Sequence, residues 1–402
     1  MIIGLFGIYG VYNFGCEAIV RGAVNFINTA FPGSKILYFS YNYKYDRAVL
    51  SDLQIDVCEV QHSKSIPKKI INRIQTAFGI EHRCLLFDYS TMLESVDAIF
   101  SIGGDIYTIP AVNRQHEKYP YYNTLVNFCS KACAMGKPVV VYGASVGPWG
   151  DYSKAVHYYV SNMKKYRAIL CREKKSEDYL TNLGFENVKF FPDPAFQVNG
   201  KNTIVAEKKY IGVNLSPLSF AEIYGSNGLN IHSELAKLMD EIVDTFNRDL
   251  MFVPHVISPN KNDNDYVFMK DIKEAMANRE RVYCANYQNG FLGIKEQLKQ
   301  CQVVVAARMH CAINAVHENI PAIFLSYSQK SVGMCQYIYG NTDYLIDLKS
   351  INLQLIKKIH TVLEQRESVV EQLTIRNKEI YDYYCENIEE LKSYFDRLKS
   401  KD

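Results

Sequence analysis

An arginine and a histidine, two positions apart, directly follow an apolar run. The run covers residues 303–307, Arg308 and His310 come next, and a helical pattern begins at once. If the run is a strand, both side chains lie at its carboxyl end, beside the unpaired N–H groups of the next helix. A guanidinium, a titratable imidazole and a helix N-terminus together form an anion site with an acid–base group. The structural alternative pairs Arg308 with a nearby carboxylate and makes His310 a helix cap.

Two further polar residues follow neighbouring predicted strands. Residues 320–325 form an apolar run, and Lys330 lies in the polar stretch after it, where it can face the same cleft as Arg308. Two cations suit a phosphate or a carboxylate, and a solvated loop lysine is the alternative. His255 lies at the end of the predicted strand 250–256 and is a candidate for substrate binding or catalysis. Open α/β sheets bind their ligands at such strand ends.

Glycine-rich turns follow three predicted strands in the first half of the chain. Glycine lets the backbone approach a ligand closely, so the amides of such turns can hold an anion or a sugar hydroxyl. The pattern is not G-x-G-x-x-G with a well-placed acid, which argues against a dinucleotide cofactor. Ordinary turns are the alternative. The candidate binding residues in these turns are Asn13, Gly15, Glu17, Gly103, Gly104, Asp105 and Ser145.

A second guanidinium is predicted at the same edge of the first sheet. Arg172 follows the apolar run 168–171 and is itself followed by Glu173. The arginine can reach across the rim of glycine turns toward an anionic ligand, or it can pair in place with Glu173. The sequence alone leaves both open.

Short apolar runs alternate with helical patterns along the chain, which predicts parallel strands covered by helices. The runs of the first half are residues 2–8, 36–39, 98–102, 139–142, 168–171 and 188–191, and those of the second half are 210–215, 250–256, 303–307 and 322–325. The predicted fold class is α/β: two Rossmann-like domains, residues 1–200 and 201–370, face a cleft at the ends of their strands. Residues 371–402 predict a C-terminal amphipathic helix that packs back on the body.

Composition excludes several classes of protein. A chain of 402 residues is too long for one ordinary core, and 45 Lys and Arg against 43 Asp and Glu argue against a nucleic-acid partner. No apolar run could span a bilayer, and the start lacks the features of a secretion signal, so we expect a cytoplasmic protein. The 11 cysteines include no C-x-x-C pair, and no carboxylate cluster calls for a metal. We therefore expect neither a metal nor a cofactor.

One predicted helix outside the cleft is both apolar and basic. Its apolar residues share one face at helical spacing, and the basic ones lie elsewhere on it or close by. Such a helix can rest on anionic lipid headgroups, peripherally at the inner face of the cell membrane. A solvated face over a core stripe is the alternative. The apolar residues are Ile66, Ile70, Ile71, Ile74 and Phe78, and the basic ones are Lys64, Lys68, Lys69, Arg73, His82 and Arg83.

Taken in order, these motifs resemble the polysaccharide pyruvyl transferase family. One position departs from it: where many members have Asn-x-Gly-Asp, this chain has Cys16, so a small buried residue or a thiol replaces that carboxylate. The resemblance rests on Gly7, Asn13-x-Gly15-x-Glu17-Ala18, Gly103-Gly104-Asp105, Gly143-x-Ser145-x-Gly147-Pro148, Arg172, Asp193-Pro194, Arg308-Met309-His310 and Pro321 to Lys330.

The resemblance implies a fold similar to GT-B glycosyltransferases and a defined reaction. Members move the enolpyruvyl carbons of phosphoenolpyruvate onto two hydroxyls of one sugar, which gives a cyclic pyruvate ketal and releases phosphate. The implied acceptor is an oligosaccharide of a cell-surface or capsular polysaccharide, in some members carried on a polyprenyl diphosphate. Arg308 and His310 would fill the family's Arg-x-His site, and Arg172 would match a basic residue at the cleft.

Two other functions fit the same residues. A GT-B glycosyltransferase would use a nucleotide sugar at the same strand ends. A non-catalytic saccharide-binding protein would use tyrosines, of which the chain has 30, to contact sugar rings. A hydride-transfer enzyme is disfavoured because the dinucleotide fingerprint is missing.

Overall fold

The computed structural model describes the whole chain except residues 64, 78–83, 202–206, 226–230, 327–328 and 400–402. The chain forms two compact units. The first consists of Met1–Val11, Ile19–Gln197 and Tyr384–Asp402, and the second of Tyr12–Ala18 and Val198–Tyr383. Each unit therefore contains a short piece of chain that is distant in sequence from its main part.

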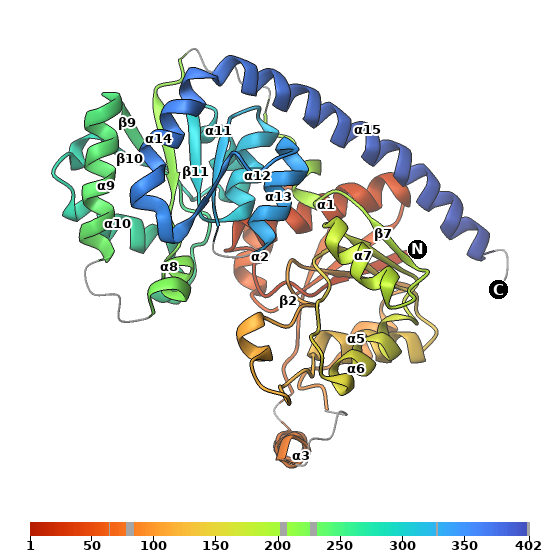
Figure 1. Cartoon of the computed structure of the whole chain (residues 1–402). Coiled ribbons are helices and arrows are strands. Elements are labelled where there is room, and N and C mark those ends of the chain that lie inside the picture. Colours follow the sequence, from red (N-terminus) through yellow and green to blue (C-terminus); the bar gives the residue numbers. More distant parts are fainter. Residues whose placement is uncertain (64, 78–83, 202–206, 226–230, 327–328, 400–402) are drawn as a thin grey trace. The chain divides into compact units, whose positions relative to one another are not determined.

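The first unit is built on a parallel sheet whose described strands have the order β3-β2-β1-β4-β5-β6-β7 (Figure 1). Its central strands are almost completely buried, because helices cover both faces of a parallel sheet; β4, for example, buries all of its residues. The strands are β1 (Ile2–Phe6), β2 (Lys35–Ser40), β3 (Asp56–Glu59), β4 (Ala98–Ile102), β5 (Val139–Ala144), β6 (Ala168–Cys171) and β7 (Val188–Phe190).

Helices connect these strands in turn. Since α1 (Phe14–Ala30) crosses the boundary at residue 18, its first turn belongs to the second unit and its remainder to the first. The other helices of the first unit are α2 (Tyr43–Val49), α3 (Ile66–Ala77), α4 (Tyr89–Glu94), α5 (Thr124–Ala134), α6 (Ser153–Met163) and α7 (Lys174–Asn182).

The second unit repeats the architecture with a parallel sheet whose described strands have the order β10-β9-β8-β11-β12-β13. The strands are β8 (Tyr210–Asn214), β9 (Asp249–Phe252), β10 (Val282–Cys284), β11 (Cys301–Ala306), β12 (Ala322–Ser326) and β13 (Leu345–Asp347). The helices are α8 (Pro217–Tyr224), α9 (Ile231–Phe246), α10 (Asp265–Ala275), α11 (Gly290–Leu298), α12 (Met309–His317), α13 (Gln329–Tyr339) and α14 (Ile351–Glu364).

The C-terminal helix α15 (Arg366–Lys399) belongs to both units. Its first part contacts the second unit, where the Asn377 side chain donates to the carbonyl of Val316 at 2.7 Å. Its last part contacts the first unit, where the ring of Tyr384 lies edge-on to Phe191, with 5.4 Å between centroids. The helix was predicted from residue 371, and it begins five residues earlier, at Arg366.

The predicted α/β fold class with two Rossmann-like sheets and a C-terminal helix is confirmed. Every predicted strand is present, with boundaries shifted by a few residues at most. Three edge strands were missed, and each is short or half-buried: β3, β10 and β13.

Candidate functional site

The segment around Asn13 pairs with the backbone that follows β9. Ile257 donates its N–H to the carbonyl of Tyr12 at 2.9 Å, and Phe14 donates its N–H to the carbonyl of His255 at 2.9 Å. Asn13 and Val256 form an antiparallel bridge between these hydrogen bonds. The first glycine-rich turn of the chain thus becomes part of the second unit.

Two predicted binding residues of this segment have structural partners. The Asn13 side chain accepts from the N–H of Gly15 at 3.0 Å, so it caps the start of α1. The fully buried Glu17 carboxylate accepts from the N–H of Phe291 at 2.8 Å, at the N-terminus of α11. Gly290 has a φ of +59°, and a Cβ there would lie 2.3 Å from Glu17 Oε2, so this position requires glycine. Glu17 therefore anchors the segment.

Gly15 lies directly against the ring of His310. A Cβ at residue 15 would lie 2.4 Å from Nδ1 and 2.7 Å from Cγ of His310, closer than non-bonded atoms approach. His310 is half-buried in the first turn of α12. The missing side chain of Gly15 therefore makes the space that the imidazole occupies.

Arg308 is the N-cap residue of α12 and follows β11, as predicted. Its Nη2 donates to Asp263 at 2.7 Å and to Asp265 at 2.8 Å, and its Nε also donates to Asp265, at 3.1 Å. The carboxylate pairing named as the structural alternative is therefore present. The side chain keeps 15% exposure, so the guanidinium is fixed on one side and partly open to solvent.

Asp265 holds several elements together with its two oxygens. Oδ1 accepts from Arg308, and Oδ2 accepts from the N–H groups of His255 and Val256, at 3.1 Å each, and from Asn214 Nδ2 at 3.2 Å. Burial raises the pKa of Asp265, and the charge of Arg308 and these hydrogen bonds oppose that change. Burial likewise disfavours the charge of Arg308, but the two carboxylates more than offset it, so the pKa of Arg308 is raised.

His255 is a buried imidazole without hydrogen bonds. Its exposure is 1%, and neither Nδ1 nor Nε2 has a partner among the described residues. The rings of Phe14 and Phe291 lie edge-on to it, with centroids 5.8 and 6.1 Å away. Burial, together with the charges of His310, Arg308 and Lys295, lowers the pKa of His255 to about 3. A neutral imidazole with two unsatisfied nitrogens is costly, so these atoms point to a polar ligand or water.

One of those charges is a buried lysine on α11. Nζ of Lys295 donates to Asn314 Oδ1 at 3.3 Å and lies 3.4 Å from Glu318 Oε1. Burial lowers the pKa of Lys295 to about 8, against the opposing effect of Glu318. Sequence analysis does not single out this group, because a lysine on a helix is ordinarily solvated.

The first unit contains a second cluster, formed by turns after adjacent strands. Arg172, which follows β6, is buried and donates to Asp105 Oδ1 at 3.0 Å, to Asp193 Oδ2 at 3.2 Å and to Ser145 Oγ at 3.1 Å. Burial disfavours its charge, but Asp105, Asp193 and Glu173 together raise the pKa of Arg172. This guanidinium is also held by carboxylates. The Asp105 side chain remains 46% exposed.

The predicted residues thus fall into two groups. Lys330 lies in the first turn of α13, and its side chain is outside the described residues. The second unit gathers Asn13, Gly15, Glu17, His255, Arg308 and His310, and the first unit gathers Gly103, Gly104, Asp105, Ser145 and Arg172.

Sequence reasoning missed the partners that orient the arginines. Asn214 ends β8 as a polar residue after an apolar run, which could have been noticed. Asp263 and Asp265 surround an asparagine that caps α10, and that pattern by itself predicts only a helix start. Nothing local connects these carboxylates with an arginine that follows 45 and 43 residues later.

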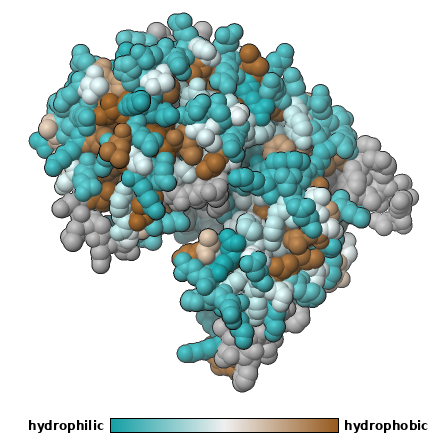
Figure 2. All heavy atoms as spheres, viewed as in Figure 1, coloured by the Kyte–Doolittle hydropathy of each residue, from teal (hydrophilic) through white to brown (hydrophobic). Residues whose placement is uncertain are grey.

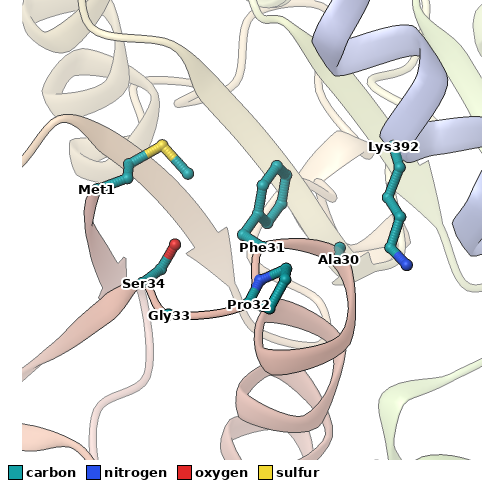
Figure 3. A pocket seen from close by; sticks show the side chains of 7 residues that line it. All are labelled: Met1, Ala30, Phe31, Pro32, Gly33, Ser34 and Lys392. Atoms are coloured by element: carbon teal, nitrogen blue, oxygen red, sulfur yellow. The ribbon is translucent and has the colours of Figure 1, made fainter.

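A surface pocket of the first unit is separate from these groups (Figure 3). Met1, Phe31 and Ser34 line it with the side chain of Lys392 from α15. Because Met1 precedes β1 and Ser34 precedes β2, the pocket lies at the amino ends of these strands. None of the predicted site residues lines it.

Comparison with known proteins gives a family and a fold. A sequence model of the family described as "Polysaccharide pyruvyl transferase" matches residues 13–329. Amylovoran biosynthesis protein AmsJ of Erwinia amylovora is 23% identical over 431 aligned positions, which cover 93% of this chain and 94% of that protein.

Two solved structures resemble the whole chain. Anabaena Alr3699/HepE, in complex with UDP and glucose, has a TM-score of 0.59 at 10% identity, covering 99% of each chain. A glycosyltransferase from Rickettsia africae has a TM-score of 0.57 at 13% identity, covering 99% of this chain and 98% of that one. These likenesses confirm the predicted GT-B-like fold.

The buried carboxylate of Asp265 should contribute more to the free energy of unfolding than the partly exposed carboxylate of Asp263. Asp265→Ala removes the buried carboxylate partner of Arg308 and leaves two backbone N–H groups without their acceptor, so we expect a loss of about 3–5 kcal/mol in the free energy of unfolding. Asp263→Ala removes a partly exposed contact to the same arginine and should cost about 1 kcal/mol or less. Urea denaturation of the whole chain measures both, and equal losses would contradict this account.

His255 should make the stability of the chain depend on pH. Its native pKa of about 3 lies below the value of about 6.5 for an unfolded histidine. Between these values only the unfolded chain takes up the proton, so the free energy of unfolding falls as the pH falls. His255→Leu removes this uptake and should flatten the slope by about 1.4 kcal/mol per pH unit. Denaturation curves from neutral to mildly acidic pH test this, and an unchanged slope refutes it.

Proposed function

The chain belongs to the polysaccharide pyruvyl transferase family, and from this premise we propose that it moves the pyruvyl group of phosphoenolpyruvate onto two hydroxyls of one sugar. The product is a cyclic pyruvate ketal, and inorganic phosphate is released. One observation carries the proposal: Arg308, His310 and the unsatisfied His255 gather in the second unit at the carboxyl ends of β11 and β9, the two strands that flank β8.

The charge balance of this group limits how it binds the donor. Arg308 with Asp263 and Asp265 carries no net positive charge, so the trio alone does not attract a phosphate and a carboxylate. The N–H groups at the start of α12 and Lys330 supply the remaining positive potential in our proposal. Arg308 contributes orientation: its planar guanidinium is already fixed when the donor arrives.

The reaction needs one proton delivered and two removed. Protonation of the donor's methylene carbon makes its C2 electrophilic, and the first sugar hydroxyl forms a C–O bond there and loses its proton. The C–O bond to phosphate then breaks, and the second hydroxyl closes the ketal and loses its proton. We assign His310 to one of these proton transfers, because a positioned acid or base contributes about 10²–10⁴ in rate. Fixed cations stabilise the leaving phosphate.

His255 has a different role in this proposal. Its low pKa keeps the imidazole neutral at physiological pH, so one ring nitrogen can donate and the other can accept. A ring N–H of His255 that lies next to a phosphate or carboxylate oxygen gains the hydrogen-bond partner that it otherwise lacks. His255 therefore binds the donor, and His310 carries the proton.

The acceptor side is assigned to the cluster of the first unit. The Asp105 side chain is 46% exposed while Arg172 holds its position, which suits a carboxylate that accepts hydrogen bonds from sugar hydroxyls. The name of AmsJ, a relative at 23% identity, points to a bacterial exopolysaccharide as the class of acceptor. Free and polyprenyl-diphosphate-linked oligosaccharides are both within the proposal.

The decisive experiment incubates the purified chain with phosphoenolpyruvate and a panel of free and lipid-linked oligosaccharides. Phosphate release and product mass are followed together. His310→Asn should lower turnover by about 10²–10⁴, whereas His360→Asn, at an exposed position of α14, should not. Near-normal turnover of His310→Asn would remove this residue from the mechanism.

Competing functions give different results in the same assay. A glycosyltransferase would transfer a sugar from a nucleotide sugar, and UDP-glucose rather than phosphoenolpyruvate would protect the chain against heat. The resemblance to Alr3699/HepE, solved with UDP and glucose, makes this the second candidate. A non-catalytic binding protein would release no phosphate with any donor.

The contact between Gly15 and His310 allows a test without removing a catalytic group. Gly15→Ala places a methyl group where the imidazole ring lies, so His310 must move, and a displacement of about 1 Å can cost about 10² in rate. The matched control is Gly333→Ala in α13, where a Cβ meets nothing within 4 Å. Equal turnover of the two variants would show that the position of His310 is not critical.

A further inference from the structure

Helix α3 lies between two stretches of chain that pair with each other. His62 and Phe87 form an antiparallel bridge, and Ser63 donates its N–H to the carbonyl of Leu86 at 2.8 Å. Figure 1 shows α3 apart from the other helices of the first unit. The helix is therefore an insertion between β3 and α4, attached by a narrow base.

One side chain fixes how α3 faces its own unit. Asn72 donates through Nδ2 to the carbonyl of Cys84 at 2.8 Å and accepts through Oδ1 from the N–H of Cys84 at 2.7 Å. This pair of hydrogen bonds directs the Asn72 side of the helix toward the chain that returns from α3 to the first unit. The opposite side of α3 then points away from it.

That opposite side carries four isoleucines. Their exposed fractions are 68% for Ile66, 53% for Ile70, 43% for Ile71 and 51% for Ile74. With about 100° per residue, they lie within an arc of about 140° whose centre is nearly opposite Asn72. Figure 2 shows a small hydrophobic area at the α3 end of the first unit. The core stripe considered as an alternative is therefore wrong for these residues; Phe78 lies outside the described ones.

The charges of α3 are all of one sign. The helix contains Lys68, Lys69 and Arg73 and no acidic residue. By the same angular count Arg73 and Lys69 border the isoleucine arc on one side, and both are exposed, whereas Lys68 is half-buried and lies near Asp88. An apolar face bordered by cations is typical of a helix that lies in a membrane interface. Lys64, His82 and Arg83, also predicted for this patch, lie outside the described residues.

We propose that α3 docks the protein on an anionic lipid surface. The isoleucines enter the boundary between headgroups and acyl chains, and Lys69 and Arg73 remain at the level of the anionic headgroups. The cations identify the occupant, since an apolar groove of a second copy would not need charges of one sign at its border. Among the residues that the structure describes, none of the helices combines the length and apolar character needed to traverse a bilayer. The proposal does not depend on the proposed reaction.

The test is sedimentation of the whole chain with phosphatidylcholine vesicles, with and without phosphatidylglycerol. The unchanged chain should bind only the vesicles that contain phosphatidylglycerol, and added salt should release it. Lys69→Gln with Arg73→Gln should weaken binding by about twenty- to thirtyfold, at roughly fivefold per cation. Ile70→Glu with Ile74→Glu should abolish it.

Matched controls separate this surface from general effects of charge. The control for the cation variant is Lys131→Gln with Lys154→Gln, which removes two positive charges at exposed lysines elsewhere in the first unit. The control for the isoleucine variant is Leu353→Glu with Ile375→Glu, which adds two negative charges at exposed apolar residues of the second unit. Both should bind like the unchanged chain. Circular dichroism should show every variant folded, because all these side chains are exposed or half-buried.

Three results would overturn the proposal. The first is no binding of the unchanged chain to phosphatidylglycerol vesicles, or equal binding to neutral ones. The second is an equal loss in the control variants. The third is a dimer in sedimentation equilibrium that Ile70→Glu with Ile74→Glu dissociates, with no vesicle binding, since this would assign the isoleucine face to a second copy of the chain.

Discussion

The second unit depends on one buried carboxylate. Asp265 receives hydrogen bonds from the end of β8, from the backbone after β9 and from Arg308 after β11. It therefore joins three strand ends that lie far apart in the sequence. Because buried polar groups strengthen one another only when all are satisfied, this network fixes one arrangement of the loops. The backbone held by Asp265 is also the backbone that pairs with Asn13.

Both units use the same means to hold a guanidinium. Arg172 and Arg308 each follow an interior strand, and each is held by two aspartates from neighbouring turns. Pairing prevents the arginine from adopting other rotamers and keeps its charge out of contact with apolar surroundings. Such an arginine loses little entropy when it meets a ligand, but it also brings little unbalanced charge. The two sites are therefore better suited to orienting a substrate than to attracting it over a distance.

Much of this architecture was predictable because central strands of parallel sheets are continuous apolar runs, and the positions of Arg308, His310 and Arg172 at strand ends followed from them. Three of the edge strands were missed: β10 and β13 have only three residues each and β3 is half-buried, although β7, an edge strand of the same length as β10 and β13, was predicted. Long-range partners were out of reach as well, since Asp265 and Arg308 share no local signal. Helical periodicity correctly grouped the isoleucines of α3, but periodicity does not tell whether a face is covered.

The residues Tyr12–Ala18 stand near the beginning of the chain but belong to the second unit, and the last turns of α15 return to the first. Neither unit is therefore encoded by one continuous stretch of gene. A single recombination between relatives near residue 198 would join a Gly15 from one parent with a His310 from the other, and only parents that agree on this contact would yield a working hybrid. During synthesis on the ribosome, nearly 300 further residues are added after Gly15 before His310 is made, so the contact between them forms late. The two halves are bound to evolve together.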